Sequence, residues 1–396
     1  MTQAVNCQGT VRAASIGYIV QSLINNFTPL LFVTFQTTYD VTLSQISIVI
    51  MVNFCVQVVL DMIATFFADR IGLRRCIVVA HFLAAAGIAG LAILPGLFAN
   101  PIVGLVLAAM IYGAGGGLND ALLTPIVQYC PIERKDKAVS MLHSFFSWGS
   151  VIVIVASTLF FHFVGIDNWK LLALIWAILP ILNGINFLRV PIYEADVREE
   201  SMSVFSLFKS GTFWILLVIM FCTGVCELTI AQWGSTFAEK GLHLSKSVGD
   251  LVGPCLFGVL LSLERVWYGK KGNDKKLWKT MLGFSIICLV CYIFICFTSS
   301  AFIALAGCAL AGFFVGIMWP GTHTLAVQVI PKGGTAMFGM LALSGDLGCG
   351  VGPAIVGVIA KRFGDSLQMG FLFAGGFAVV MILALLGLKK KNRYLM

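Results

Sequence analysis

The chain has 396 residues, of which 59% are hydrophobic and only 11% are charged, and its formal net charge is +8. A soluble protein of this composition would expose too much apolar surface to water, which excludes a soluble enzyme or binding domain. We expect an all-α polytopic membrane protein, because runs of about 20 apolar residues cross a bilayer as helices.

Twelve apolar stretches are long enough to cross a bilayer, and little sequence lies between them. They cover residues 14–37, 44–67, 76–97, 101–129, 138–164, 169–189, 211–238, 247–268, 279–299, 301–330, 335–360 and 367–388. The longest polar connection between two sets of six spans runs from Arg189 to Ser210. The sequence therefore predicts six-helix bundles at 1–190 and 211–396, joined by a cytoplasmic linker at 191–210.

Positive charge is distributed unevenly among the loops. If the N-terminus is cytoplasmic, the opposite loops hold only five of the 26 lysines and arginines: Lys170, Lys240, Lys246, Lys361 and Arg362. This bias predicts a multi-pass protein of the cytoplasmic (plasma or inner) membrane with both termini in the cytoplasm. The net positive charge is then explained by contact with lipid head groups, so we expect no nucleic-acid partner.

The 12 cysteines are scattered, mostly within the predicted spans. Cys288 and Cys291 form a C-x-x-C pattern, but they lie on an apolar helix with no accompanying ligands, which favours a packing role. The sequence contains no nucleophile–base pair of recognisable spacing and no metal-ligand cluster. We therefore expect neither an enzyme nor a cofactor.

The two halves carry a faint repeat at an offset of 200 residues, which equates the fourth span with the tenth. The matching pairs are Gly116 and Gly316, Thr124 and Thr324, Val127 and Val327, Gln128 and Gln328, and Pro131 and Pro331. A repeat of this kind predicts that the two bundles are related by pseudo-symmetry.

The loop between the second and third spans carries the most specific motif. It resembles the signature G-x-x-x-D-R-x-G-R-R-K of the major facilitator superfamily, which it matches at Asp69, Arg70, Gly72, Arg74 and Arg75. Gly72 lets the chain turn between antiparallel helices, and the Asp69 carboxylate suits a helix N-terminus. The resemblance implies the major facilitator fold, and it implies that this loop is a conformational latch against the start of the eleventh span.

A closer resemblance covers most of the chain. Residues 113–120, 224–227 followed by 232–233, and 316–320 look like the fucose–galactose–glucose permease branch of that superfamily. Sugar–proton symporters of this branch carry one acidic residue in the first span and another in the fourth, where Asp120 fits. The first span offers Gln21 and the Asn25–Asn26 pair in place of an acid.

A loop related to the signature is expected after the eighth span. Residues 264–272 keep its charge and glycine but lose its pattern. A second latch at this loop is a weaker expectation of the same resemblance.

Carboxylates inside apolar spans are costly to insert and therefore indicate function. We predict proton-coupling roles for Asp120, Glu227 and Asp346. A fourth carboxylate, Asp61, lies nearer the cytoplasmic end of its span, where gating is favoured. For each of these residues, a hydrogen-bonded packing role is the alternative.

Other polar and aromatic side chains within the spans could line a solute cavity. Amide groups offer paired donors and acceptors, tryptophan rings stack on sugar faces, and a histidine can relay protons. The predicted substrate-binding residues are Asn25, Asn26, Asn53, Gln57, Asn119, Trp148, Gln232, Trp233, Trp319 and His323. For the tryptophans and the histidine, helix packing is the alternative interpretation.

These observations predict a monomeric secondary transporter that moves a small polar solute by alternating access, with a sugar as the first candidate. Proton-coupled symport is the expected driving mechanism. An efflux antiporter and an uncoupled facilitator of the same fold remain open. An alternative from another class is a membrane sensor that binds a ligand without transporting it.

Overall fold

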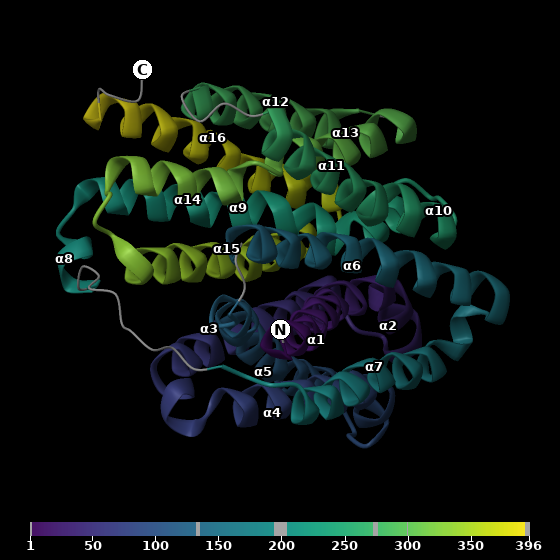
Figure 1. The fold of residues 1–396 in the computed structure, drawn as a ribbon. Coiled ribbons are helices and arrows are strands. Elements are labelled where there is room, and N and C mark those ends of the chain that lie inside the picture. The colour runs from purple at the N-terminus through teal and green to yellow at the C-terminus, as the bar shows by residue number, and fades with distance from the viewer. Residues whose placement is uncertain (1, 132–134, 194–203, 272–275, 299, 393–396) are drawn as a thin grey trace. The chain divides into compact units, whose positions relative to one another are not determined.

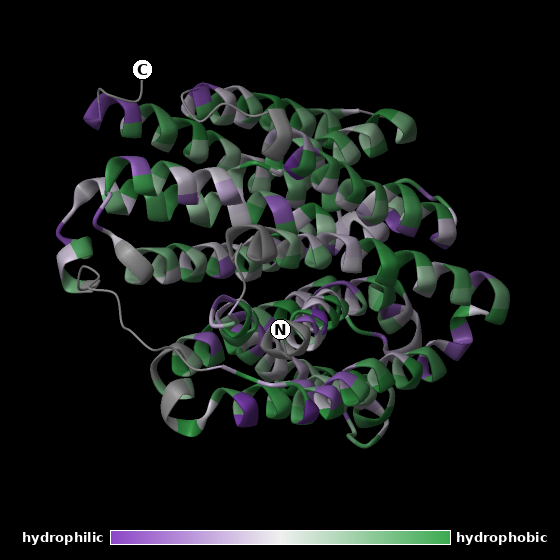
Figure 2. Cartoon of the chain, viewed as in Figure 1, coloured by the Kyte–Doolittle hydropathy of each residue, from purple (hydrophilic) through white to green (hydrophobic). Residues whose placement is uncertain are grey.

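The computed structural model describes residues 2–131, 135–193, 204–271, 276–298 and 300–392. These residues form helices and no strand, and twelve spans among them are long and apolar enough to cross a membrane (Figure 1). The prediction of an all-α, twelve-span protein is confirmed. Hydrophobic residues dominate the helices throughout (Figure 2).

The chain divides into two compact units, Met1–Val197 and Arg198–Met396. Residues 194–203, which form much of the expected linker, lie outside the described residues. Each unit supplies six of the twelve candidate spans.

The described residues of the first unit form seven α-helices, two of which share the first span. In chain order they are α1 (Thr2–Asn26), α2 (Phe32–Tyr39), α3 (Leu43–Ile71), α4 (Leu73–Ile93), α5 (Pro101–Gln128), α6 (Lys135–Val164) and α7 (Trp169–Arg189). Helix α5 packs against α1, α3 and α4, while α4 also packs against α7 and α1 against α6. This arrangement brings α1, α3 and α5 together around the polar residues described below.

Two local features shape the ends of the first three spans. The first span changes to a 3₁₀ turn at Thr28–Leu31, where Pro29 lacks the N–H that a continuous α-helix needs. The turn between α3 and α4 is made at Gly72, whose φ of 102° strains any residue with a side chain. This glycine lets the second and third spans follow each other with almost no connecting loop.

The described residues of the second unit form nine helices and two π-helical segments. They are α8 (Val204–Phe208), α9 (Gly211–Thr236), a π segment (Phe237–Gly241), α10 (Lys246–Asp250), a second π segment (Leu251–Cys255), α11 (Leu256–Lys271), α12 (Leu277–Phe297), α13 (Ala301–Val315), α14 (Met318–Val329), α15 (Gly334–Arg362) and α16 (Leu367–Lys391). Helix α9 packs against α15 and α16, α11 against α13, and α12 against α13 and α16.

The tenth span is interrupted rather than continuous. Helix α13 ends at Val315 and α14 begins at Met318, which leaves a break at residues 316–317 near the middle of the span. Pro320 then falls in the first turn of α14, where its missing N–H would have no partner within the helix. Proline therefore favours a new helix start here, and the backbone groups at the break need partners from other helices.

Candidate functional site

The first unit holds a buried hydrogen-bond network that joins three helices. Gln21 on α1 donates through Nε2 to Gln57 Oε1 on α3 (2.9 Å) and to Asp120 Oδ2 on α5 (2.6 Å). The Nε2 group of Gln57 donates in turn to Asn25 Oδ1 and Asn53 Oδ1, each at 3.0 Å. We call these five residues the amide network. All are buried except Asp120, which is half-buried.

Gln21 joins Gln57 to Asp120 in this network, although it was not among the predicted substrate-binding residues. It lies four residues before Asn25, so both side chains share one face of α1. That spacing was the available signal. The Oε1 atom of Gln21 is buried and has no hydrogen-bond partner, so it is an acceptor open to a donor from a ligand.

Glycines on α5 make the space that the network occupies. A Cβ at Gly116 would lie 2.9 Å from the amide carbon of Gln57, and one at Gly117 only 2.1 Å from the backbone oxygen of Gln57. A Cβ at Gly113 would similarly lie 2.8 Å from the backbone oxygen of Asn53. The glycine-rich sequence of the fourth span therefore lets α3 approach closely enough to form the network.

Three other predicted residues of this unit lie apart from the amide network. Asn26 donates to the Ser22 backbone oxygen (2.9 Å) and to Ser150 Oγ on α6 (3.0 Å), so it joins α1 to α6. Asn119 is fully buried, and neither of its amide atoms has a hydrogen-bond partner. Trp148 is 45% exposed on α6, as expected for a ring that faces the surroundings of its unit.

The second unit contains an ion pair inside its helices. Arg265 on α11 donates through Nη2 to both carboxylate oxygens of Glu227 on α9, at 3.1 and 3.2 Å. Its Nε atom donates to the Gly316 backbone oxygen at 3.2 Å. Arg265 therefore neutralises a buried carboxylate and also satisfies a carbonyl at the break in the tenth span.

This pairing places Glu227, one of the predicted proton-coupling residues, in an ion pair with Arg265. Glu264 and Arg265, which were assigned to a loop after the eighth span, lie within α11. The signal that could have revealed the pair is a cation inside one predicted span and an anion inside another.

Two tryptophans of the second unit fit between helices. Trp233 is fully buried, and its Nε1 donates to the Pro353 backbone oxygen on α15 at 2.8 Å. Trp319 packs against Gly345 of α15, where a Cβ would come within 2.6 Å of two ring atoms. Both rings thus have packing roles in this structure, and Trp319 is partly exposed.

The remaining predicted residues of this unit are distributed over three helices. His323 lies four residues after Trp319 on α14, and its ring centroid is 5.3 Å from that of Phe338. Asp346 is half-buried on α15, and Gln232 is buried on α9.

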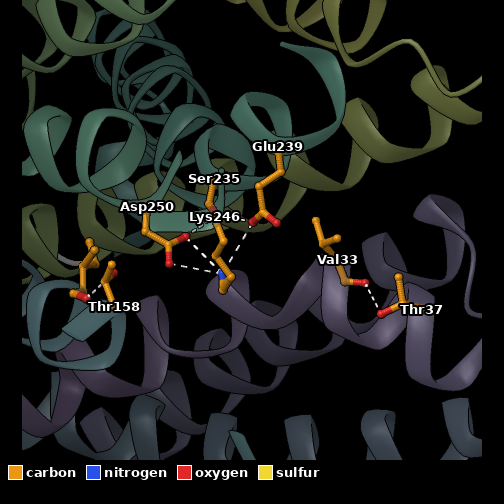
Figure 3. A network of polar contacts seen from close by, with 8 residues as sticks. Val33, Thr37, Thr158, Ser235, Glu239, Lys246 and Asp250 are labelled. Atoms are coloured by element: carbon orange, nitrogen blue, oxygen red, sulfur yellow. Dashed lines mark hydrogen bonds and ion pairs between the residues drawn. The ribbon is translucent and has the colours of Figure 1, made fainter. Parts of the chain in front are cut away.

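A second charged cluster joins the seventh and eighth spans at their π-helical segments (Figure 3). Lys246 lies 3.1 Å from the fully buried Asp250 and 3.5 Å from Glu239, and the single hydroxyl donor of Ser235 lies within hydrogen-bond distance of both carboxylates. From the sequence, Lys246 was expected only as a charge in a loop. The cluster satisfies these groups internally and fixes the connection between α9 and α10.

The signature loop is anchored within its own unit. Arg74 donates through Nη1 to the Phe187 and Leu188 backbone oxygens, at 2.7 and 2.9 Å, at the end of α7. Arg75 is exposed, and the side chains of Asp69 and Arg70 lie outside the described residues.

Among the described residues, no group of three or more histidine, cysteine, aspartate or glutamate side chains could hold a metal ion. The cysteines are all free thiols, and most are buried.

Comparison with known proteins places this architecture. Residues 14–337 match the sequence model of the Major Facilitator Superfamily. A variant of the nucleoside transporter NupG superposes with a TM-score of 0.76 at 14% identity, covering 97% of this chain and 99% of its own. A bacterial homologue of the human lysosomal transporter Spinster, solved inward-facing and occupied, gives a TM-score of 0.76 at 13% identity and 96% coverage of each chain. Curated protein sequences contain no match.

Proposed function

Because the chain belongs to the major facilitator superfamily, we propose that it is a secondary transporter driven by proton symport. It would move a small polar solute across the cytoplasmic membrane by alternating access, acting as a monomer. The observation that carries this proposal is the amide network of the first unit. Four amide side chains and one carboxyl are gathered where the surrounding helices are apolar.

The chemistry of the amide network favours a solute that carries hydroxyl groups. Each amide presents a donor and an acceptor in fixed positions, and hydroxyls can do the same. Gln21 Oε1 adds an acceptor without a partner, which a solute hydroxyl can satisfy. A sugar is the first candidate, and Asn25, Asn53 and Gln57 are its proposed ligands together with Gln21.

Asp120 is the proposed coupling residue, with Glu227 and Asp346 as further candidates. Its Oδ2 accepts a hydrogen bond from Gln21 at 2.6 Å. Protonation at Oδ2 would turn this acceptor into a donor, so Gln21 would have to reorient. Because Gln21 also holds Gln57, a proton on Asp120 would change the donors and acceptors that the solute meets.

The signature loop is proposed to be a conformational latch made of Asp69, Arg70, Gly72, Arg74 and Arg75. The left-handed turn at Gly72 and the attachment of Arg74 to the end of α7 support this role. A latch must be held rigidly by its own unit if it is to act on another element.

The test is proton uptake into proteoliposomes loaded with a pH dye, on addition of single sugars, nucleosides and other small metabolites. Acidification of the lumen by one solute, absent in empty liposomes, is the expected result. In Asp120→Asn, we expect proton-driven accumulation of that solute to disappear while counterflow exchange persists. Accumulation that survives in Asp120→Asn would remove Asp120 from the coupling role.

Other outcomes would replace the proposal by one of its competitors. Entry of a solute without a pH change would mean an uncoupled facilitator. Proton movement opposite to the solute would mean an antiporter. Saturable binding of a solute that never crosses the membrane would mean a sensor.

A further inference from the structure

A second buried carboxyl lies beside the ion pair of Glu227 and Arg265. Glu264 on α11 has no solvent exposure, and neither of its carboxyl oxygens has a hydrogen-bond partner. Its Oε2 atom faces the break in the tenth span, since a Cβ at Gly316 would lie 2.6 Å away. The ion pair does not need this residue, so its presence requires a separate explanation.

A charged Glu264 would be expensive in this position. Burial of a carboxylate without a hydrogen bond or a counter-ion costs several kcal/mol, whereas the neutral acid costs much less. Arg265 is the described charged group that acts on Glu264, and it is already engaged by Glu227 and by the Gly316 carbonyl. Of the other titratable groups nearby, Tyr268 lies one turn further along α11, and residues 309–317 of the adjoining span supply none.

We propose that Glu264 is a proton-binding site, and that its charge decides whether Arg265 is held by Glu227 or by Glu264. With the proton bound, Arg265 pairs with Glu227, as in this structure. When the proton leaves to water, the new carboxylate competes for the adjacent guanidinium. This inference rests on the proposed proton-coupled function and adds a residue and an exchange to it.

The exchange would reach the backbone of the tenth span. The Nε atom of Arg265 donates to the Gly316 oxygen, at the C-terminal end of α13, where a cation stabilises the helix end. Withdrawal of Arg265 would leave that carbonyl without its partner at the point where the span is already interrupted. Discontinuous helices of this kind line the binding sites of many transporters and change shape during their cycles.

The first test needs no solute. Infrared difference spectra of the protein in liposomes, recorded as the pH is raised, should contain a carboxylic-acid carbonyl band that disappears as the proton leaves. We expect Glu264→Gln to lack this band. The matched control Asp365→Asn removes an exposed carboxyl of the same unit and should keep it. A band that is unchanged in Glu264→Gln would overturn the assignment.

A second variant tests the exchange independently of whether Glu264→Gln folds. Glu227→Gln removes the competitor, so Arg265 becomes available to stabilise the Glu264 carboxylate. The Glu264 band should then disappear at lower pH than in the wild type. If it disappears at the same pH, Arg265 does not move between the two carboxyls and the exchange is wrong.

The two proposals fail in distinguishable ways. If wild-type liposomes show no proton flux with any solute but the Glu264 band behaves as expected, symport is refuted and the proton site stands. If solute-driven proton flux is normal and the band is insensitive to Glu264→Gln, symport stands and the inference is refuted. If symport and the proton site at Glu264 are both correct, we expect solute-driven proton flux in Glu264→Gln to fall to the level of empty liposomes.

Discussion

The two units hold polar side chains inside the membrane in different ways. The first unit uses uncharged amides that hydrogen-bond to one another, with Asp120 at one end of the chain of hydrogen bonds. The second unit uses full charges, with Arg265 set between Glu227 and the Gly316 carbonyl. Buried polar groups can therefore be stabilised either by hydrogen bonds between neutral side chains or by pairing of opposite charges.

Exchange of an amide's hydrogen-bond partner costs little free energy, because a solute hydroxyl can replace a neighbouring amide with a hydrogen bond of similar strength. A net hydrogen bond is worth only about 0.5–1.5 kcal/mol. A buried ion pair is different, since the loss of one partner leaves the other charge uncompensated. We therefore propose that the amide network recognises the solute and that the ion pair of Glu227 and Arg265 is controlled by a proton.

The strongest test of this contrast is Arg265→Ala. It leaves the buried Glu227 carboxylate without its cation, so we expect a loss of about 3–5 kcal/mol in unfolding free energy. Addition of Glu227→Gln should recover part of the loss, because it removes the orphaned charge. The measurement is denaturant unfolding of the purified protein in micelles.

The control is Lys361→Ala, which breaks the pair with Asp365. Both of these side chains are about half exposed, at 48% and 56%, so the change should cost less than about 1 kcal/mol. Equal losses in Arg265→Ala and Lys361→Ala would show that the inner pair is solvated and would erase the contrast between the units.

A pair of adjacent glycines tests the amide network. Alanine at Gly117 meets the Gln57 backbone oxygen, so α3 and α5 must separate, at a cost of about 1–3 kcal/mol. Alanine at Gly116 meets only the flexible end of the Gln57 side chain. It should cost less stability but displace the Gln57 amide, which weakens solute binding. Unfolding in micelles and the KM for transport separate the two effects.

Gly283→Ala is the matched control for both glycine variants. This glycine lies in α12, and a Cβ there would meet nothing within 4 Å. We expect unchanged KM and unchanged or slightly higher stability, because alanine favours the helix. A raised KM in Gly283→Ala as well as in Gly116→Ala would attribute the effect to general loosening rather than to Gln57.

The spans could be predicted from the sequence because the thickness of a bilayer sets the length of the apolar run that each helix needs. The turn at Gly72 could also be predicted, since a tight turn between antiparallel helices often needs a residue with positive φ. Asn53 and Gln57 were predicted as binding residues, and their spacing of four places them on one face of α3, where they are hydrogen-bonded. These are features of single segments, which local sequence can encode.

The partners across helices could not be read in the same way. The attachment of Arg265 to Glu227 depends on how α9 and α11 rotate against each other, and one sequence carries no record of that contact. Gln21 was passed over because an acid was expected in its place. The break at residues 316–317 was hidden because the apolar run continues through it.

The smallest expected loss of stability is for Arg74, a cation that lies outside the amide network and outside the ion pair of Glu227 and Arg265. Arg74→Ala removes the donor to the Phe187 and Leu188 oxygens at the end of α7, where a cation contributes about 0.3–1 kcal/mol. The neighbouring Arg75→Ala is the matched control, because its exposed side chain belongs to the same motif. We expect a lower unfolding midpoint in micelles for Arg74→Ala alone.

If the two variants lose the same stability, the net charge of the loop matters rather than the hydrogen bonds to α7. If only Arg74→Ala loses stability, a cation on backbone carbonyls has a small structural effect, far below that of Arg265 beside a buried carboxylate.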